Sequence, residues 1–245
     1  MIERRENWVI SAQDLGPAGE LRAEVLQKRL MDLSIDHSLA LGCGWEAMRG
    51  EGCFWALARL KVVVFRHPII GENLSLLTWP SPAIPSGIWR SYHLETVAGE
   101  RIAQAMGLWA IIDIPTGKPR RCDHFPLWNS SLPYRQEPIW SEGIGPWPGS
   151  ITVEAKSCIR TVEASDIDAN GHVNNLRYIA YTQDALKVFG DPWEGYRSYR
   201  IHYLSPLFAG DTLTLSLIPS DTKKEVRGVT ERSPAKLTAF RCLIE

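Results

Sequence analysis

The chain contains an internal repeat, and this feature restricts its fold more than any other. When Asp14 is placed on Asp166, the residues that follow correspond one by one through a glycine into a helix-like stretch. Farther along, the run PIIGENLSL at 68–76 resembles PLFAGDTLTL at 206–215, with one residue inserted. Self-similarity of this kind decides the domain count before local patterns do. We therefore expect two domains of related fold.

The stretch between the two copies, 116–150, is rich in proline, tryptophan and glycine, which is typical of a linker. We therefore expect a first domain over 1–115 and a second over 151–245. A chain of 245 residues has room for two modest domains of this kind.

Both copies show the same order of expected elements: a strand, a long helix and four further strands. Apolar residues recur at helical spacing over 20–41 and 175–189, and Gly42 and Gly190 follow as C-terminal caps. Strand-like runs lie at 54–65, 73–79, 88–96 and 102–114, and then at 196–204, 212–218, 225–230 and 237–244. An antiparallel sheet wrapped around one buried helix satisfies this order, so we expect an α+β fold.

The composition is that of an ordinary globular protein, with 44% hydrophobic and 22% charged residues and a formal net charge of −1. This balance gives no electrostatic reason to expect nucleic acid or an anionic membrane as the partner. No apolar run approaches the roughly 20 residues of a membrane helix. The first residues lack a hydrophobic signal core, so we expect a cytoplasmic location. The five cysteines are odd in number and form no CxxC pair, so we expect neither a disulfide framework nor a zinc site.

The two copies differ in a way that points to chemistry, because the second has Asp168, Asn170 and His172 at alternating positions. If that stretch is extended, the three side chains project to one side. The adjoining helix start offers backbone N–H groups and a positive dipole end. A carboxylate, an amide and an imidazole in that setting suit acyl transfer. The matching positions of the first copy hold Gly16, Ala18 and Glu20.

Two other interpretations of this segment compete with the catalytic one. Asp166, Asp168 and Asn170 fit the first, third and fifth positions of an EF-hand calcium loop, but the twelfth position is Arg177 where a Glu is required. A strand, rather than a helix, also precedes the segment. The structural alternative is a polar turn leading into a helix that Asn174 caps. We favour catalysis, and we expect no metal and no cofactor.

Residues 166–178, DIDANGHVNNLRY, look like the signature of the acyl-acyl carrier protein thioesterases, enzymes that release free fatty acids from fatty acid synthesis. The first half resembles the same family in DHSLALG at 36–42, LSLLTWP at 74–80 and LWAIID at 108–113. The similarity therefore covers nearly the whole chain. The family contains two hotdog domains in one polypeptide, so the resemblance implies tandem hotdog domains here, each an antiparallel sheet wrapped around a long central helix.

By this resemblance, Asp168, Asn170 and His172 match the family's catalytic Asp, Asn and His. The second domain is then catalytic, and the first, with its degenerate site, binds the acyl chain. The family often adds a Glu in the strand after the long helix, and that position here falls on Pro206, as it falls on Pro68 in the first copy. Asp168 is then left to supply the carboxylate. The implied partner is an acyl carrier protein bearing a fatty acyl chain. We expect a monomer, since two fused hotdogs imitate the usual dimer, or a homodimer.

Three rival functions stay open at this point. An acyl-CoA thioesterase uses the same fold, and a non-catalytic acyl binder or sensor is favoured by Pro206 but opposed by the polar trio. A hotdog dehydratase is disfavoured, because no recognisable motif pairs a histidine with a catalytic carboxylate. Outside the trio, His37 follows the apolar face of the first long helix, so we expect a core histidine. His202 shares strand parity with Pro206, which would allow it to reach toward the catalytic loop, but we expect an exposed strand residue instead.

Overall fold

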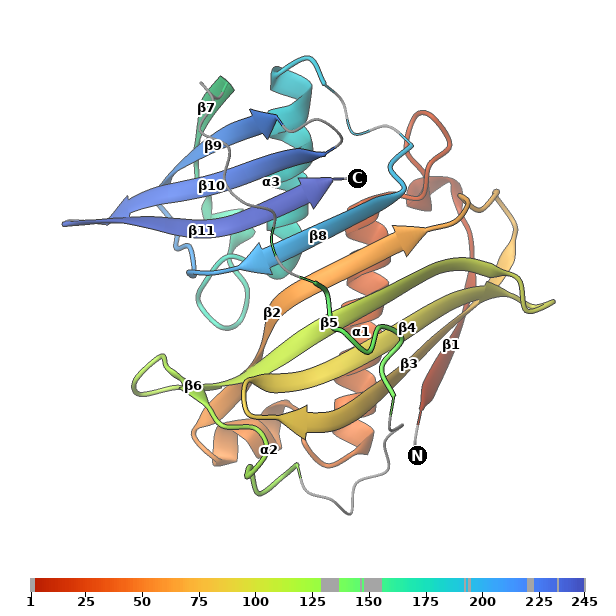
Figure 1. Ribbon diagram of the computed structural model, residues 1–245, viewed down its shortest axis with the longest axis horizontal. Coiled ribbons are helices and arrows are strands. Elements are labelled where there is room, and N and C mark those ends of the chain that lie inside the picture. The colour runs from red at the N-terminus through yellow and green to blue at the C-terminus, as the bar shows by residue number, and fades with distance from the viewer. Residues whose placement is uncertain are drawn as a thin grey trace. The chain divides into compact units, whose positions relative to one another are not determined.

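The computed structural model describes residues 3–128, 137–145, 147, 156–191, 193, 195–219, 223–232 and 234–244. The chain divides into two compact units, Met1–Gly145 and Pro146–Glu245 (Figure 1). Each unit contains one long helix and an antiparallel sheet, so the α+β class expected from the sequence is confirmed.

The first unit contains β1, a short 3-10 turn, α1, α2 and five further strands. Their bounds are β1 Arg4–Val9, the 3-10 turn Ala12–Asp14, α1 Ala23–Ala40, α2 Trp45–Gly50, β2 Cys53–Val64, β3 Asn73–Ile84, β4 Gly87–Thr96, β5 Arg101–Asp113 and β6 Pro119–Arg120.

The second unit repeats this series without a counterpart of α2 or β6 among its described residues. Its elements are β7 Lys156–Thr161, the 3-10 turn Ala164–Asp166, α3 Asn175–Val188, β8 Ser198–Tyr203, β9 Thr212–Pro219, β10 Lys224–Arg232 and β11 Ala235–Ile244.

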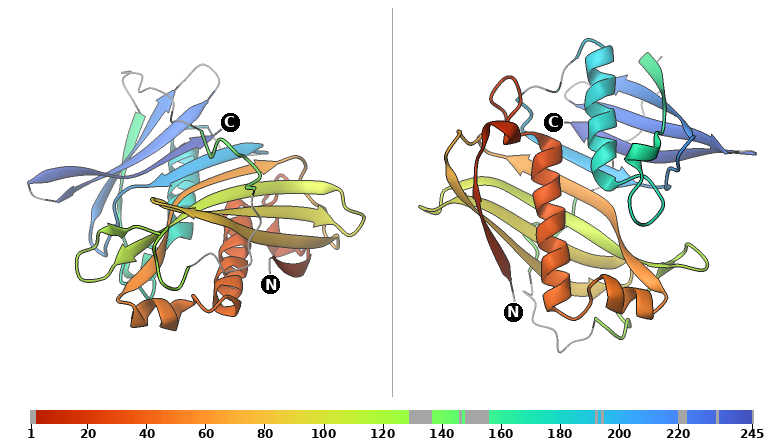
Figure 2. Two further views of the ribbon diagram at one scale, coloured as in Figure 1. Left: turned by 60° about the horizontal axis from the view of Figure 1, so that its bottom comes forward. Right: turned by 180° about the vertical axis from the view of Figure 1, so that it is seen from behind.

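The two units share one sheet topology. The strand order is β1-β3-β4-β5-β2 in the first unit, with β6 added to β5, and β7-β9-β10-β11-β8 in the second. In both, the strand before the long helix stands at one end of the order and the strand after it at the other. Each long helix lies against one face of its own sheet (Figure 2). The internal repeat of the sequence is therefore a repeat of topology.

The long helices form where the apolar spacing predicts them. In α1 the expected stripe of Leu26, Leu30 and Leu33 is buried, and Gly42 lies just beyond the helix with a φ of 77° that favours glycine. In α3 the side chain of Asn174 accepts a hydrogen bond from the Leu176 amide at 2.9 Å, so its predicted role as N-cap is confirmed.

The strands also lie close to their predicted positions, with ends that differ by a few residues. The largest difference is β3, which was expected to stop at residue 79 and continues through Pro80 to Ile84. The pairing of β3 with β4 is irregular between Pro80 and Ala83, where proline withholds an amide from the ladder. The short helix α2 was not predicted, because six residues do not establish a helical period.

Part of the segment expected to be a linker, 116–150, packs into the first unit. Residues Cys122, Phe125 and Trp128 are buried against α2 and the ends of β2, β4 and β5. The Trp128 ring meets that of Trp55 edge to face, with centroids 5.9 Å apart. The tryptophan content that suggested a linker therefore reflects, in this part of the segment, a small apolar core.

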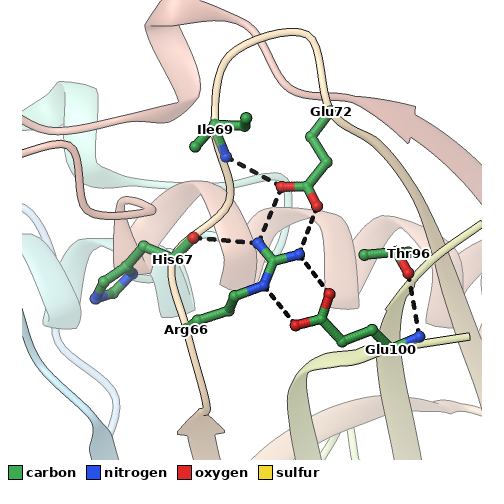
Figure 3. Close-up of polar contacts among 6 residues, drawn as sticks. All are labelled: Arg66, His67, Ile69, Glu72, Thr96 and Glu100. Atoms are coloured by element: carbon green, nitrogen blue, oxygen red, sulfur yellow. Dashed lines mark hydrogen bonds and ion pairs between the residues drawn. The ribbon is translucent and has the colours of Figure 1, made fainter. Parts of the chain in front are cut away.

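The loop between β2 and β3 is held by the guanidinium of Arg66, which donates to Glu72 at 2.6 Å and to Glu100 at 2.7 Å (Figure 3). These bonds hold the pKa of both carboxyls below the usual range. Glu72 also accepts from the Ile69 amide at 3.1 Å. In the second unit Asp211 closes the corresponding loop, since it accepts from the Phe208 amide at 2.8 Å.

His37 is buried in the first unit, as expected from its place on the helix. Its Nδ1 lies 3.0 Å from Nη1 of Arg90, a guanidinium that is itself only 4% exposed. Burial lowers the pKa of Arg90. The Arg90 guanidinium also lies 3.5 Å from the hydroxyls of Thr78 and Ser38. This histidine belongs to a polar cluster in the core, and its predicted structural role is confirmed.

All five cysteines are free thiols. Burial raises the pKa of Cys43 to about 11 and that of Cys242 to about 12, so these two thiols stay protonated at neutral pH. Within the described residues, no helix is long and apolar enough to cross a membrane.

The β10–β11 pair yields a first testable prediction at Gly228. Phe240 lies opposite, and a Cβ built on Gly228 would stand 2.2 Å from its ring. Because that ring is fully buried, we expect Gly228→Ala to destabilise the protein by about 1–3 kcal/mol. Equilibrium urea denaturation measures the change.

Gly50→Ala in α2 is the matched control, since nothing lies within 4 Å of its added methyl group. The same substitution there is expected to be neutral or to stabilise by up to about 1 kcal/mol, because alanine is the better helix former. Equal effects at the two glycines would contradict the packing of Phe240 over Gly228.

Candidate active site

The segment that carries the polar trio is a closed turn. The Asp168 amide donates to the His172 carbonyl at 3.0 Å, and the Gly171 amide donates to the Asp168 carbonyl at 2.9 Å. Gly171 has a φ of 81°, a conformation that favours glycine. The turn is bracketed by an antiparallel bridge between Ile167 and Val173. Residues 168–172 are therefore not extended, the condition under which their side chains would project to one side, but the three side chains share one short turn.

The same turn, with the same backbone bonds, lies before α1 in the first unit. There the Gly16 amide donates to the Glu20 carbonyl at 2.8 Å and the Gly19 amide to the Gly16 carbonyl at 3.0 Å. A bridge between Leu15 and Leu21 brackets it. The backbone conformation therefore does not depend on the trio. A turn-forming role alone does not explain why the second unit has these side chains.

Within the second turn, Oδ1 of Asp168 accepts the Asn170 amide at 2.8 Å. Its Oδ2 has no hydrogen-bond partner among the described residues. The Oδ1 of Asn170 is buried, and the described part of the chain offers it no hydrogen-bond donor. Nδ1 of His172 lies 3.4 Å from the Val173 carbonyl. The turn thus has a carboxylate oxygen that is able to accept a bond from a ligand or water, beside an amide oxygen that is buried without a donor among the described residues.

The start of α3 is more fully satisfied than expected. The Val173 and Asn174 amides donate to the carbonyls of Leu207 and Asp166, at 2.8 and 2.9 Å. The Leu176 and Arg177 amides both donate to Asn174, one to its side chain and one to its carbonyl, at 2.9 Å each. These four N–H groups are not available to polarise a carbonyl. The helix end still contributes the positive end of its dipole.

Asp166, just before the turn, is a residue whose role the sequence did not reveal. Its carboxylate is almost fully buried and accepts Tyr181 Oη and Arg177 Nε, both at 2.6 Å. Burial by itself raises the pKa of Asp166, but these bonds and the Glu163 amide outweigh it and hold the pKa below the usual range. Burial and the bond to Asp166 also raise the pKa of Tyr181. The calcium interpretation fails here, because Arg177 occupies the carboxylate that would be the first ligand.

Pro206 lies near the turn in space, because the carbonyl of the next residue, Leu207, accepts the Val173 amide at 2.8 Å. The position where the resembling family often has a glutamate is therefore adjacent to the trio. The carbonyl of Pro206 itself accepts a hydrogen bond from Arg232 Nη2 at 2.6 Å. A proline supplies no carboxylate, so the carboxylate within the turn is that of Asp168.

His202 is buried, and the expectation that it is exposed was wrong. It is 9% exposed, and its ring lies 4.4 Å from the Trp147 ring. Trp147 in turn donates to Glu225 at 2.9 Å and lies against the guanidinium of Arg241. Trp147 comes from the segment expected to be a linker. The periodicity of a strand does not predict that a residue as distant in the sequence as Trp147 will bury His202.

The comparisons with known proteins agree over both units. The model described as the acyl-ACP thioesterase N-terminal domain matches residues 3–124, and the model of the C-terminal domain of the same family matches residues 152–229. The chain belongs to the acyl-ACP thioesterase family. The resemblance drawn from DIDANGHVNNLRY is thereby confirmed.

Among relatives of this thioesterase-family chain, a chloroplastic palmitoyl-acyl carrier protein thioesterase of Arabidopsis thaliana is 25% identical over 198 residues, which are 75% of this chain and 47% of the plant protein. The oleoyl-acyl carrier protein thioesterase 1 of the same plant is 20% identical over 213 residues, 76% of this chain and 55% of its own length. The chain spans about half the length of the curated relatives it matches.

Two solved structures share the fold. An acyl-ACP thioesterase from Bacteroides thetaiotaomicron superposes with a TM-score of 0.80 at 22% identity, and covers 99% of this chain and 96% of its own. The 12:0-ACP thioesterase from Umbellularia californica superposes with a TM-score of 0.81 at 17% identity, with the same coverage. At these identities the likeness establishes the fold alone.

Proposed function

We propose that this protein hydrolyses fatty acyl thioesters and that its substrate is a fatty acyl chain carried on an acyl carrier protein. The observation that carries the proposal is the turn before α3, which has the backbone of its counterpart before α1 but adds Asp168, Asn170 and His172. Membership of the acyl-ACP thioesterase family supports it. The reaction would release a free fatty acid, as in fatty acid biosynthesis.

We further propose that the two units are tandem hotdog domains with a division of labour. The second, with the trio, is the catalytic domain. The first has the same turn without the trio, so it is available for binding the acyl chain. Each buried methylene contributes roughly 0.8 kcal/mol, so an apolar interior selects chain length without polar contacts.

In the proposed mechanism, Asp168 supplies the carboxylate, either as the base that removes a proton from water or as the nucleophile that forms a transient mixed anhydride. Its Oδ2 has no hydrogen-bond partner among the described residues, which supports this role. Asn170 orients the carboxylate by donating from its side-chain NH2 group, or the water by accepting at Oδ1. His172 hydrogen-bonds the reacting group.

The leaving group of the proposed reaction needs little help from an acid in the site. Cleavage of the C–S bond releases a thiolate, whose conjugate acid has a pKa of about 8.5, so strong acid assistance is less necessary than for an amide. The positive end of the α3 dipole favours the charge that develops on the carbonyl oxygen. A carboxylate, an amide and an imidazole are therefore sufficient for the reaction proposed here.

The test is a steady-state hydrolysis screen of one set of acyl chains presented both on acyl carrier protein and on coenzyme A. We expect turnover with both carriers and a higher kcat/KM with the carrier protein. A preference for coenzyme A would replace the proposed substrate with an acyl-CoA. Binding of acyl chains with no turnover on either carrier would favour an acyl-binding protein, the alternative that Pro206 supports.

A further inference from the structure

The carboxylate of Asp166 joins the candidate turn to the face of α3. It is 1% exposed and accepts hydrogen bonds from Tyr181 Oη and Arg177 Nε, each at 2.6 Å. Residues 177 and 181 are four apart on α3, so they lie on one face of the helix. Bonds to an ionised carboxylate are shorter and stronger than neutral ones. The side chain of Asp166 is therefore firmly tied to the first two turns of the helix.

The main chain of Asp166 is tied to the same helix. Its carbonyl accepts the amide of Asn174, the N-cap of α3, at 2.9 Å. Residues 167–173, which carry the trio, lie between Asp166 and Asn174, the two residues that this backbone bond joins. The position of the trio relative to the amino end of α3 thus depends on one residue that is not itself in the trio.

The first unit has the same turn without the trio, so it shows which contacts the turn itself requires. Asp14 matches Asp166, and its carbonyl likewise accepts the amide before the helix, that of Arg22, at 2.9 Å. Within the described residues, however, its carboxylate accepts only from donors before the turn: Ser11 through its amide and hydroxyl, at 2.8 and 2.9 Å, and Trp8 Nε1 at 3.3 Å. The positions of α1 that match Arg177 and Tyr181 hold Val25 and Arg29.

The two units satisfy the matching aspartates differently. A buried carboxylate needs donors, and Asp14 finds them before the turn, in Ser11 and Trp8. The second unit has Glu163 and Arg160 at those two positions and draws side-chain donors from α3 instead. In the unit that has the trio, the aspartate side chain therefore also fixes the turn to the helix.

We propose that Asp166, Tyr181 and Arg177 are positioning residues for the active site. They hold the turn with Asp168 at a fixed distance and orientation from the amino end of α3, without touching the substrate. The inference rests on the proposed thioester hydrolysis. It adds three residues to that function, each with a defined bond to test.

Tyr181→Phe is the sharpest variant, because it removes one hydroxyl and keeps the ring. The ring packs against Tyr178, with centroids 6.2 Å apart, and lies under the Arg160 guanidinium at 4.5 Å. We expect kcat to fall by about 10-fold or more with KM nearly unchanged, since small misplacements of reacting groups are costly in rate. A role in stability alone would change the unfolding midpoint and leave kcat at its original value.

Thr182→Val is the matched control. Thr182 is the next residue of α3, is equally buried, and donates to the Tyr178 carbonyl at 2.8 Å rather than to Asp166. It removes one buried hydroxyl from the same helix, so its effect on stability is comparable. Its kcat should match that of the unmodified protein.

Amide hydrogen exchange supplies a readout that does not depend on activity. We expect Tyr181→Phe to speed exchange in the peptide that spans 166–174, and Thr182→Val to leave it unchanged. A kcat for Tyr181→Phe equal to that of Thr182→Val overturns the proposal. If the unmodified protein hydrolyses no thioester, the proposed function fails, while exchange in the same two variants still decides whether these residues position the turn.

Discussion

Asp168→Asn is expected to lower kcat by at least about 10²-fold, the usual contribution of a positioned acid–base group. The carboxamide keeps the shape of the side chain and an oxygen for the Asn170 amide, which Asp168 Oδ1 accepts at 2.8 Å. The turn should therefore persist. The neutral side chain neither takes a proton from water nor attacks a carbonyl carbon. Steady-state kinetics on the preferred acyl thioester, with the unfolding midpoint measured in parallel, separate lost chemistry from lost fold.

Glu20→Gln in the first unit is the matched control. The Glu20 carboxylate accepts the Ala18 amide at 3.0 Å, the position that corresponds to Asn170. The control thus removes one negative charge and keeps a comparable backbone bond in a turn of the same conformation. We expect unchanged kcat. His172→Ala should resemble Asp168→Asn, and near-normal turnover in both would end the catalytic assignment.

The fold was predictable from the sequence because its signals are local. The stripe of Leu26, Leu30 and Leu33, the Asn174 cap and the glycines after both long helices each lie within a few residues of what they specify. The strands β3, β4 and β5 and the strands β9, β10 and β11 pair as successive hairpins, whereas β2 and β8 pair with β5 and β11, which lie farther along the chain. A repeat of these signals then predicts two units of one topology, as observed.

The sequence left two conformations open for the segment with Asp168, Asn170 and His172, an extended stretch or a polar turn. In the structure the chain closes between residues 168 and 172. The signal for a turn was present, since a glycine with positive φ occurs at the same place in both copies, at Gly19 and Gly171. The spacing of residues in the sequence predicts where their side chains point only if the backbone conformation is known.

Contacts between distant residues were beyond the reach of sequence patterns. Tyr181 lies 15 positions from Asp166, and its hydroxyl carries no periodic signal that marks it as a partner. Likewise Trp147 reaches Glu225 across 78 positions of the chain. Burial on both faces of β8, which makes His202 a core residue, follows from that cover and not from the strand itself.

Phe240→Ala is expected to have the largest effect on stability, a loss of about 3–5 kcal/mol. The ring is fully buried and lies 5.2 Å from the Tyr178 ring of α3, so it fills the space between helix and sheet. Its neighbour across β10 is Gly228, which has no side chain to fill the space that is left. Because the cavity is bounded by a helix and a glycine, it cannot collapse easily, and the cost falls at the upper end for such substitutions.

Phe208→Ala makes the same change in the same unit at a ring that is 42% exposed. Its main contact is the Arg232 guanidinium, 4.5 Å from the ring centroid, and an exposed pair of this kind contributes about 0.5–1 kcal/mol. In equilibrium urea denaturation, the loss in the free energy of unfolding should therefore be several-fold larger for Phe240→Ala than for Phe208→Ala. Comparable losses would mean that the core of the second unit does not lie between α3 and β11, and the position of the trio at the start of α3 would lose its structural basis.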